Sequence, residues 1–325
     1  RPRPPALNRR AAPSGANLHG HRGHNGTRSA KLPKSTNPGE RIVFLKTGSV
    51  WEMRADGSDA TQLTVRPSEA GHESPALSPD GSKLAYVAPR DGSYRLVVMS
   101  MTELIPTELT GHEDGQVGEP AWSPDGKTNA FMHGDTRDTR SLVLIATSTG
   151  TTSTLHAWSD DAPEVAGGPA WSPNGKTIVV ASDRQKGQGT VLWAIDVEAR
   201  DARRLTEGSD SGYHRDRHPA WTPDGKRIVF ASNRHATNPD QSEDEELYVV
   251  DIDGKNLVRL TEGRGVSTDP CVSPDGKRII FTSTRDAKEP YESDLYVMAI
   301  SGGAAARLST DPRPQNSAPS VAIQR

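Results

Sequence analysis

Residues 219–228 read PAWTPDGKRI, and this stretch recurs with small changes along the chain. The other copies are PALSPDGSKL at 75–84, PAWSPDGK at 120–127, PAWSPNGKTI at 169–178 and PCVSPDGKRI at 270–279. Their leading prolines are 45, 49, 50 and 51 residues apart. A strand-rich repeat of about 40 to 50 residues is typical of β-propeller blades, because each blade is a small sheet that must stack on its neighbours.

Each copy predicts a tight turn with a strand on either side. In Thr222–Gly225 the proline presets the φ angle of the second turn position, and the glycine tolerates positive φ at the fourth. An apolar strand follows, as in Ile228–Phe230, and a further strand alternates apolar and polar residues in ELYVVDID (246–253). The unit closes on Leu260-Thr261 or a near match. This order predicts four antiparallel strands per repeat, which make one blade.

The two ends of the repeat region complement each other. SAPSVAI (317–323) carries a proline in phase with the repeats, but no turn follows it. GERIVF (39–44) matches GKRIVF (225–230), but the strand that should precede it is missing. We therefore expect the C-terminal strand to pair with the segment near Ile42 and so remove the free sheet edges. The prediction is an all-β, six-bladed β-propeller of four-stranded antiparallel blades over residues 39–325.

Residues 1–38 differ in composition from the rest of the chain. They hold eight Arg and Lys residues and no acidic residue, and they are rich in Pro and Gly. Because the whole chain has a net charge of -3, the remainder carries -11 once the +8 of this segment is removed. We expect a disordered basic tail or linker that associates with an acidic envelope surface. No aromatic residues interleave the basic ones, and the acidic body opposes nucleic acid, so we expect no nucleic-acid partner.

Several classes of protein are excluded. No stretch approaches the roughly 18 consecutive apolar residues of a membrane-spanning helix. Cys271 is the single cysteine, so the chain has no internal disulfide. The Gly-x-Ser-x-Gly elbow of α/β-hydrolases is absent, since GSDSG (208–212) has aspartate at its centre. Binding is therefore expected rather than catalysis.

The repeats resemble those of a known family. The Pro-Ala-Trp-Ser-Pro-Asp-Gly-Lys runs and the closing Leu-Thr pairs are similar to the WD40-like propeller repeats of the TolB family, over roughly residues 39–325. TolB has an α/β domain before its propeller, and here 38 residues precede the repeats, so the resemblance is to the propeller alone. It implies a monomeric interaction module, periplasmic or secreted, that binds a protein or peptide partner.

Strand direction predicts where that partner binds. The residues just before each repeat proline should lie at the end of the channel opposite the Ser-Pro-Asp-Gly turns, together with the loops after the second strands. Loops on a rigid scaffold commonly carry function, so this channel face is the expected binding face. The candidate binding residues are His72, Glu73, Glu119, His214, Arg217, His218 and Asp269.

Three alternatives to this interpretation stay open. The channel could be a hydrated opening whose charges satisfy one another. It could hold a cation such as Ca²⁺, although no spacing matches a metal signature and no other cofactor is expected. A carbohydrate-active lyase or hydrolase could be built on His214, His218, Tyr213 and Asp216, since His with carboxylates supports acid–base chemistry. The competing interpretation of that last cluster is a solvated loop with local ion pairs.

Two further patterns are interpreted as structural. Trp122, Trp171 and Trp221 recur at one repeat position, which predicts packing between blades rather than a stacking platform for a ligand. The acidic stretch SEDEE (242–246) lengthens one loop, and we expect it to form a solvated edge.

Overall fold

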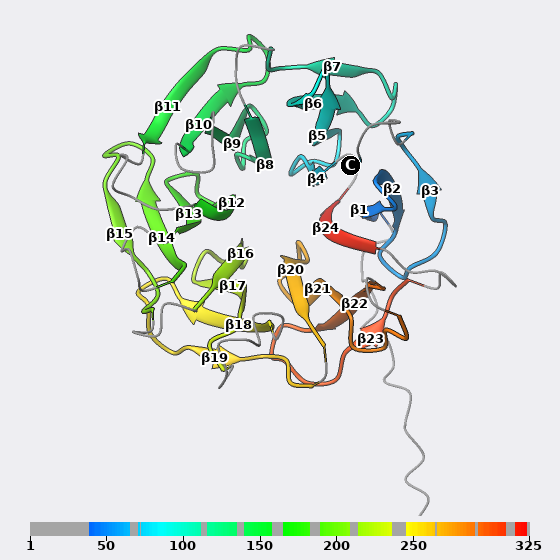
Figure 1. Ribbon diagram of the computed structural model, residues 1–325, viewed down its shortest axis with the longest axis vertical. Coiled ribbons are helices and arrows are strands. Elements are labelled where there is room, and N and C mark those ends of the chain that lie inside the picture. Colours follow the sequence, from blue (N-terminus) through cyan, green and yellow to red (C-terminus); the bar gives the residue numbers. More distant parts are fainter. Residues whose placement is uncertain are drawn as a thin grey trace, which may run out of the picture.

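The computed structural model describes residues 39–65, 71, 73–111, 116–134, 140–157, 165–182, 189–208, 214–235, 245–263, 265–289, 292–309 and 316–323. These residues form 24 strands in six four-stranded sheets, which are arranged in a ring (Figure 1). The predicted all-β, six-bladed propeller is confirmed. None of the described residues forms a helix, and so none forms an apolar helix that could cross a membrane. The tail predicted for residues 1–38 lies outside the described residues.

Each blade runs from an inner strand beside the channel to a short outer strand. Blade 1 contains β24 (Asn316–Ile323), β1 (Glu40–Lys46), β2 (Ser49–Arg54) and β3 (Thr61–Gln62). Blade 2 contains β4 (Glu73–Leu77), β5 (Lys83–Arg90), β6 (Ser93–Ser100) and β7 (Pro106–Glu108), and blade 3 contains β8 (Gln116–Trp122), β9 (Thr128–Gly134), β10 (Arg140–Ala146) and β11 (Thr152–Ala157). Blade 4 contains β12 (Val165–Trp171), β13 (Thr177–Ser182), β14 (Val191–Asp196) and β15 (Ala202–Arg204). Blade 5 contains β16 (Asp216–Trp221), β17 (Arg227–Ser232), β18 (Glu246–Asp251) and β19 (Val258–Arg259), and blade 6 contains β20 (Ser267–Val272), β21 (Arg278–Ser283), β22 (Asp294–Ala299) and β23 (Ala306–Arg307).

The ring closes as the two chain ends predict. β24 pairs with β1 in antiparallel register, and Val321 stands opposite Ile42. Figure 1 shows the last strand lying beside the first at the edge of the channel. Blade 1 is thus built from both ends of the chain, so opening the ring requires separation of β1 from β24.

The turns follow the chemistry of their residues. In blade 3 the C=O of Ser123 accepts a hydrogen bond from the N–H of Gly126, whose φ is 68°. The Asp125 carboxylate accepts from the Ser123 hydroxyl at 2.6 Å and from the Lys127 N–H at 3.1 Å. Blade 4 reaches the same geometry with Asn174, whose Oδ1 accepts from the Ser172 hydroxyl at 2.8 Å. The aspartate or asparagine at this position is a turn former, and each turn begins three residues after the repeat proline, as Ser123 follows Pro120.

The core consists of six apolar clusters, and each fills the space between two neighbouring blades. The predicted packing role of the tryptophans is supported by their contacts. The Trp122 indole N–H donates to the Ala76 carbonyl of the preceding blade, and Trp221 donates to Ala170 in the same way. A Leu-Thr pair, or Leu-Ser in blade 6, closes five of the blades; in blade 4 the Thr206 hydroxyl accepts from the Leu192 N–H at 2.9 Å. Adjacent blades are therefore joined by both apolar contact and specific hydrogen bonds.

Candidate functional site

A β-bulge places one residue of each inner strand at the mouth of the channel. In β16 the pairing runs from Arg217 opposite Ala231 to Ala220 opposite Val229, so His218 and Pro219 together face a single residue of β17. The other five inner strands show the same two-against-one register at their repeat prolines. A bulge is a place where a strand tolerates proline, which has no N–H to give to the ladder.

The bulge also sets the backbone of the residue before each proline. Five of the six have φ angles between 47° and 51°, in the left-handed region that non-glycine residues rarely adopt. These five are Ser74, Glu119, His218, Asp269 and Ala318. Positive φ in a non-glycine residue costs free energy, and such residues are enriched at functional sites as well as in turns. Here the conformation turns each of these residues out of the regular strand alternation.

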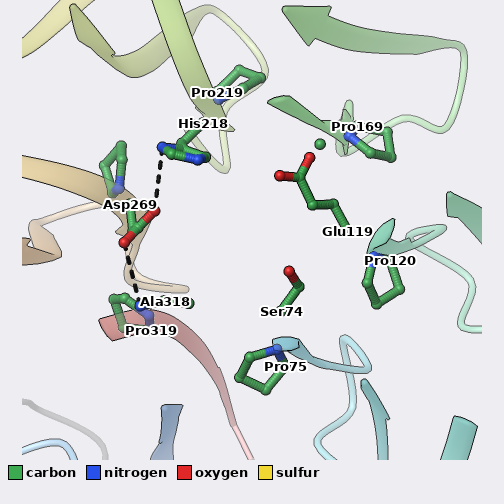
Figure 2. Close-up of a pocket in the computed structure, with 12 residues that line it drawn as sticks. Ser74, Pro75, Glu119, Pro120, Pro169, His218, Pro219, Asp269, Ala318 and Pro319 are labelled. Atoms are coloured by element: carbon green, nitrogen blue, oxygen red, sulfur yellow. Dashed lines mark hydrogen bonds and ion pairs between the residues drawn. The ribbon is translucent and has the colours of Figure 1, made fainter. Parts of the chain in front are cut away.

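Together these residues and their prolines line one pocket of about 170 Å³ (Figure 2). The pre-proline residues in ring order are Ser74, Glu119, Gly168, His218, Asp269 and Ala318, and the prolines are Pro75, Pro120, Pro169, Pro219, Pro270 and Pro319. We call the six pre-proline residues the mouth ring. One residue from every blade contributes to it, so the pocket exists only when the ring is closed.

His218 and Asp269 form the best-defined contact of the mouth ring. The Nδ1 atom of His218 lies 3.2 Å from Oδ1 of Asp269 and 2.9 Å from the Thr268 hydroxyl. Oδ2 of Asp269 accepts from the backbone N–H of Ala318 at 3.4 Å. Figure 2 shows this chain of contacts running across three neighbouring blades. Nε2 is the imidazole nitrogen outside the contact, and it is the atom with which His218 could meet a ligand.

A buried carboxylate, that of Glu245, lies near His218 and Asp269. Glu245 has a side chain that is 9% exposed, and its nearest cationic partner is Nε of Arg217 at 3.7 Å. Burial raises the pKa of Glu245, the charge of Arg217 opposes this rise, and the charge of Asp269 adds to it. Glu245 thus lies within electrostatic reach of Asp269 and of the cationic side chains of Arg217 and Arg215.

The seven predicted site residues separate into groups. Glu119, His218 and Asp269 line the pocket together. Arg217 lies one residue away and contacts Glu245, and Glu73 is exposed at the start of β4, where it hydrogen-bonds with Tyr94. His72 lies outside the described residues. His214 is buried and is not among the pocket residues.

His214 belongs to a buried network between blades 4 and 5. Its Nε2 lies 2.9 Å from Oδ1 of Asp216, which also receives hydrogen bonds from Arg234 and from the Thr206 hydroxyl. Asp216 is fully buried; burial opposes its ionisation, but the His214 hydrogen bond and the Arg234 charge hold its pKa below the usual value. The interpretation of this stretch as a solvated loop is wrong for His214 and Asp216. They stabilise the junction between two blades, whereas His218 faces the channel; Tyr213 lies outside the described residues.

The prediction of a solvated edge is also wrong for the end of SEDEE. Glu245 and Glu246 are 7% and 2% exposed. Glu246 accepts hydrogen bonds from the Thr261 hydroxyl and from Arg259 at 3.1 Å, so it pins the outer strand of its own blade. Arg259 and Thr261 lie 13 and 15 residues after Glu246 in the chain. Sequence reasoning missed Glu245 as a neighbour of the site because an acidic run normally indicates solvent exposure.

Metal binding at the mouth gains no geometric support. Within the described part of the chain, no group of three or more His, Cys, Asp or Glu side chains is arranged to hold a metal ion. The channel cation considered from the sequence stays an untested prediction.

Comparison with known proteins agrees with the repeats. Residues 233–324 match the family model of the TolB beta propeller domain. The uncharacterized peptidase YuxL of Bacillus subtilis (strain 168) is 29% identical over 246 residues, which cover 69% of this chain and 31% of the relative. The chain thus spans less than a third of that protein's length.

Two solved structures share the fold. TolB from Acinetobacter baumannii superposes with a TM-score of 0.70 at 19% identity, covering 87% of this chain and 66% of that one. An oligogalacturonate lyase in complex with manganese gives a TM-score of 0.54 at 16% identity, covering 85% and 75%. At these identities the likeness shows the fold alone. The match at residues 233–324 shows that the C-terminal part of the ring is similar to the TolB beta propeller domain.

Proposed function

We propose, from the premise that this ring is a TolB-type six-bladed β-propeller, that the chain is an interaction module which binds a segment of a protein partner at the mouth ring. The observation that carries this proposal is the convergence of six pre-proline residues, one from each blade, on a single pocket. Ligand sites are concave and hold a few convergent polar groups, and Glu119, His218 and Asp269 supply them here.

The size of the pocket favours a peptide segment. Its volume of about 170 Å³ is below the roughly 300 Å³ at which small-molecule sites begin. One side chain or one chain terminus fills such a space, while the rest of a partner segment lies across the surrounding loops. The catalytic alternative loses His214, which is held in the buried Asp216 network, away from the pocket residues.

The proposal extends to location. The TolB resemblance supports a periplasmic or secreted protein, and the basic segment 1–38 is proposed to hold it at an acidic envelope surface. Cell fractionation of the full chain and of a form without residues 1–38 tests this. Unchanged fractionation after the deletion removes the role proposed for the segment.

Site-specific photo-crosslinking in the native host tests the binding proposal. A photoreactive amino acid is placed at Ala318 in the mouth ring, and as a control at Lys226, an exposed turn residue at the other end of the inner strands. We expect a covalent adduct with a protein partner from Ala318 and none from Lys226. The absence of any adduct at Ala318, or the same adducts from both positions, overturns the proposal.

A further inference from the structure

Arg234 of blade 5 binds a carboxylate of its own chain from a fixed position. Its guanidinium lies over two aromatic rings, with Cζ 5.4 Å from the centroids of both Phe230 and Tyr248. Nε donates to the Ser232 hydroxyl at 3.2 Å. Nη2 donates to both oxygens of Asp216, at 2.9 and 2.8 Å. The rings and the serine thus orient a guanidinium toward a carboxylate.

Arg285 of blade 6 is held in the same way. Its Cζ lies 5.1 Å from the centroid of Phe281 and 4.9 Å from that of Tyr296. Nε donates to the Ser283 hydroxyl at 3.1 Å. Aromatic faces attract a cation, and a planar guanidinium stacks on them. The blade itself therefore fixes the orientation of the Arg285 guanidinium.

Blade 6 has a serine where blade 5 has the carboxylate. Asp216 and Ser267 occupy the same place, since each begins the inner strand of its blade and stands opposite a serine of the second strand. Nη2 of Arg285 donates to the neutral Ser267 hydroxyl at 3.2 Å. Among the residues that the structure describes, none places a carboxylate within ion-pair distance of Arg285. The charge of this arginine thus has no counter-charge in contact with it.

Two carboxylates, those of Glu246 and Asp286, lie within electrostatic reach of Arg285 but contact other groups. Glu246 accepts from Arg259 at 3.1 Å, and Asp286 accepts from the Tyr296 hydroxyl at 2.7 Å. Burial lowers the pKa of Arg285, and the nearby charges oppose this effect only in part. An arginine stays protonated at neutral pH despite such a decrease. Arg285 is therefore a partly exposed cation that is oriented but not neutralised.

Arg285 adjoins the mouth ring through a short stretch of β20. Ser267, which it contacts, is followed in the chain by Thr268 and Asp269. The Thr268 hydroxyl lies 2.9 Å from Nδ1 of His218, and both His218 and Asp269 line the pocket. A segment bound at the mouth ring can thus extend to Arg285 across two residues of one strand.

We propose that Arg285 is a binding residue that recognises a carboxylate of the partner segment, either an aspartate or glutamate side chain or a free C-terminus. This inference rests on the proposed function and adds the chemistry of the ligand. The ion pair of Arg234 with Asp216 supports a carboxylate, because the same arrangement binds one inside the chain. Arginine suits this group, since its planar N–H groups match the two carboxylate oxygens.

Binding of short peptides to the full chain tests the inference. The probes are N-acetylated pentapeptides: an amidated pair with glutamate or glutamine at the centre, and the glutamine peptide with a free C-terminus. Glutamine keeps the shape of glutamate and removes its charge. We expect either carboxylate to raise the affinity about tenfold or more over the amidated glutamine peptide, the ratio expected for one charge-assisted hydrogen bond. The tighter of the two acidic peptides distinguishes a side chain from a C-terminus.

Four variants test the role of Arg285 itself. Arg285→Gln should abolish the preference for a carboxylate, and Arg285→Lys should retain part of it because the charge remains. Ser267→Asp gives blade 6 the carboxylate of blade 5, so it should abolish the preference while Arg285 is still present. The matched control is Arg234→Gln, which should keep the preference because Arg234 is already paired with Asp216. Melting temperatures show that each variant is folded, and Ser267→Asp carries the test if Arg285→Gln is not.

The outcomes discriminate between the two proposals. Equal affinity of the wild-type chain for the three peptides, or no detectable binding of any, overturns the inference. So does an undiminished preference in Ser267→Asp, or a loss in Arg234→Gln as large as in Arg285→Gln. If the Ala318 crosslink to a partner persists in these cases, the proposed function stands and the inference alone falls. A preference that Arg285→Gln removes, without any adduct at Ala318, overturns the proposed function and leaves Arg285 as a separate carboxylate site.

Discussion

The guanidinium of Arg278 donates hydrogen bonds to both carboxylate oxygens of Glu40, and the two side chains are 3% and 2% exposed. Arg278 belongs to blade 6 and Glu40 to blade 1, so this buried ion pair joins the last blade to the first. The blade formed from both chain ends thus has an electrostatic tie to its neighbour as well as the β1–β24 ladder.

Removing one partner of this pair should destabilise the ring strongly. Glu40→Gln leaves a buried arginine without its counter-charge, and the expected loss is about 3 to 5 kcal/mol in the free energy of unfolding. Urea unfolding of the full chain measures it. The control is Asp59→Asn, which breaks the exposed pair with Arg54 at 2.6 Å and should cost less than about 1 kcal/mol. Equal effects of the two substitutions would contradict the structural role of Arg278 and Glu40.

A buried asparagine, Asn129, lowers the stability of blade 3. Asn129 is fully buried, and neither side-chain amide atom finds a hydrogen-bond partner among the described residues. The same repeat position carries isoleucine at 178, 228 and 279, each buried between blades. Asn129→Ile should therefore raise the free energy of unfolding by about 1 to 3 kcal/mol, since it removes an unsatisfied polar group.

Two further variants serve as controls for the Asn129→Ile measurement. Asn129→Val tests whether any shortfall comes from the extra volume of isoleucine. Ile178→Asn places the same unpaired amide in blade 4 and should destabilise. A decrease in stability for both substitutions of Asn129 would mean that the amide has a partner or a role in the native protein.

The Asp216 network should produce a pH-dependent contribution to stability. Its folded-state pKa is lowered relative to the unfolded chain, so its contribution is complete above about pH 4, the unfolded pKa, and is lost as pH falls toward the folded value. We expect Asp216→Asn to be less stable than wild type at pH 7, and the difference to shrink below pH 4. Urea unfolding at a series of pH values gives that difference. A gap that is constant or widens in acid contradicts this assignment.

Replacing a turn aspartate with asparagine should preserve the stability of the protein, whereas replacing it with alanine should lower it. Asn174 already makes in blade 4 the hydrogen bonds that Asp224 makes in blade 5, from the preceding hydroxyl and from the backbone N–H two residues on. Asp224→Asn should leave the melting temperature nearly unchanged, while Asp224→Ala should cost about 1 kcal/mol. A large loss for the asparagine variant would show that the charge itself matters in this turn.

Most of the fold follows from local chemistry that a single sequence displays. The Pro-Asp-Gly turns and the alternation of strands such as 246–251 depend on neighbouring residues, and their recurrence counts the blades. The match between 39–44 and 225–230 predicts the closure, which the pairing of Ile42 with Val321 confirms. Strand direction places Glu119, His218 and Asp269 on inner strands beside the channel, and all three line one pocket.

The parts that could not be predicted depend on contacts between strands. Whether two residues of β16 face one of β17 is decided by the register of the pair, which residues 216–221 do not reveal. The burial of Glu246 depends on Thr261 and Arg259, which return to it from another strand. The need for glycine at 168 comes from Glu119, 49 residues earlier in the chain.

The repeated bulge fixes the backbone of the inner strands independently of the side chains that could contact a partner. Because the register and the following proline define the backbone at five of the six positions, different amino acids can be displayed there on the same scaffold. Ser, Glu, Gly, His, Asp and Ala already occupy these positions in one chain. A propeller of this design can acquire new partners, by evolution or by engineering, through coordinated substitutions around one opening, since Glu119 restricts residue 168 and His218 contacts Asp269.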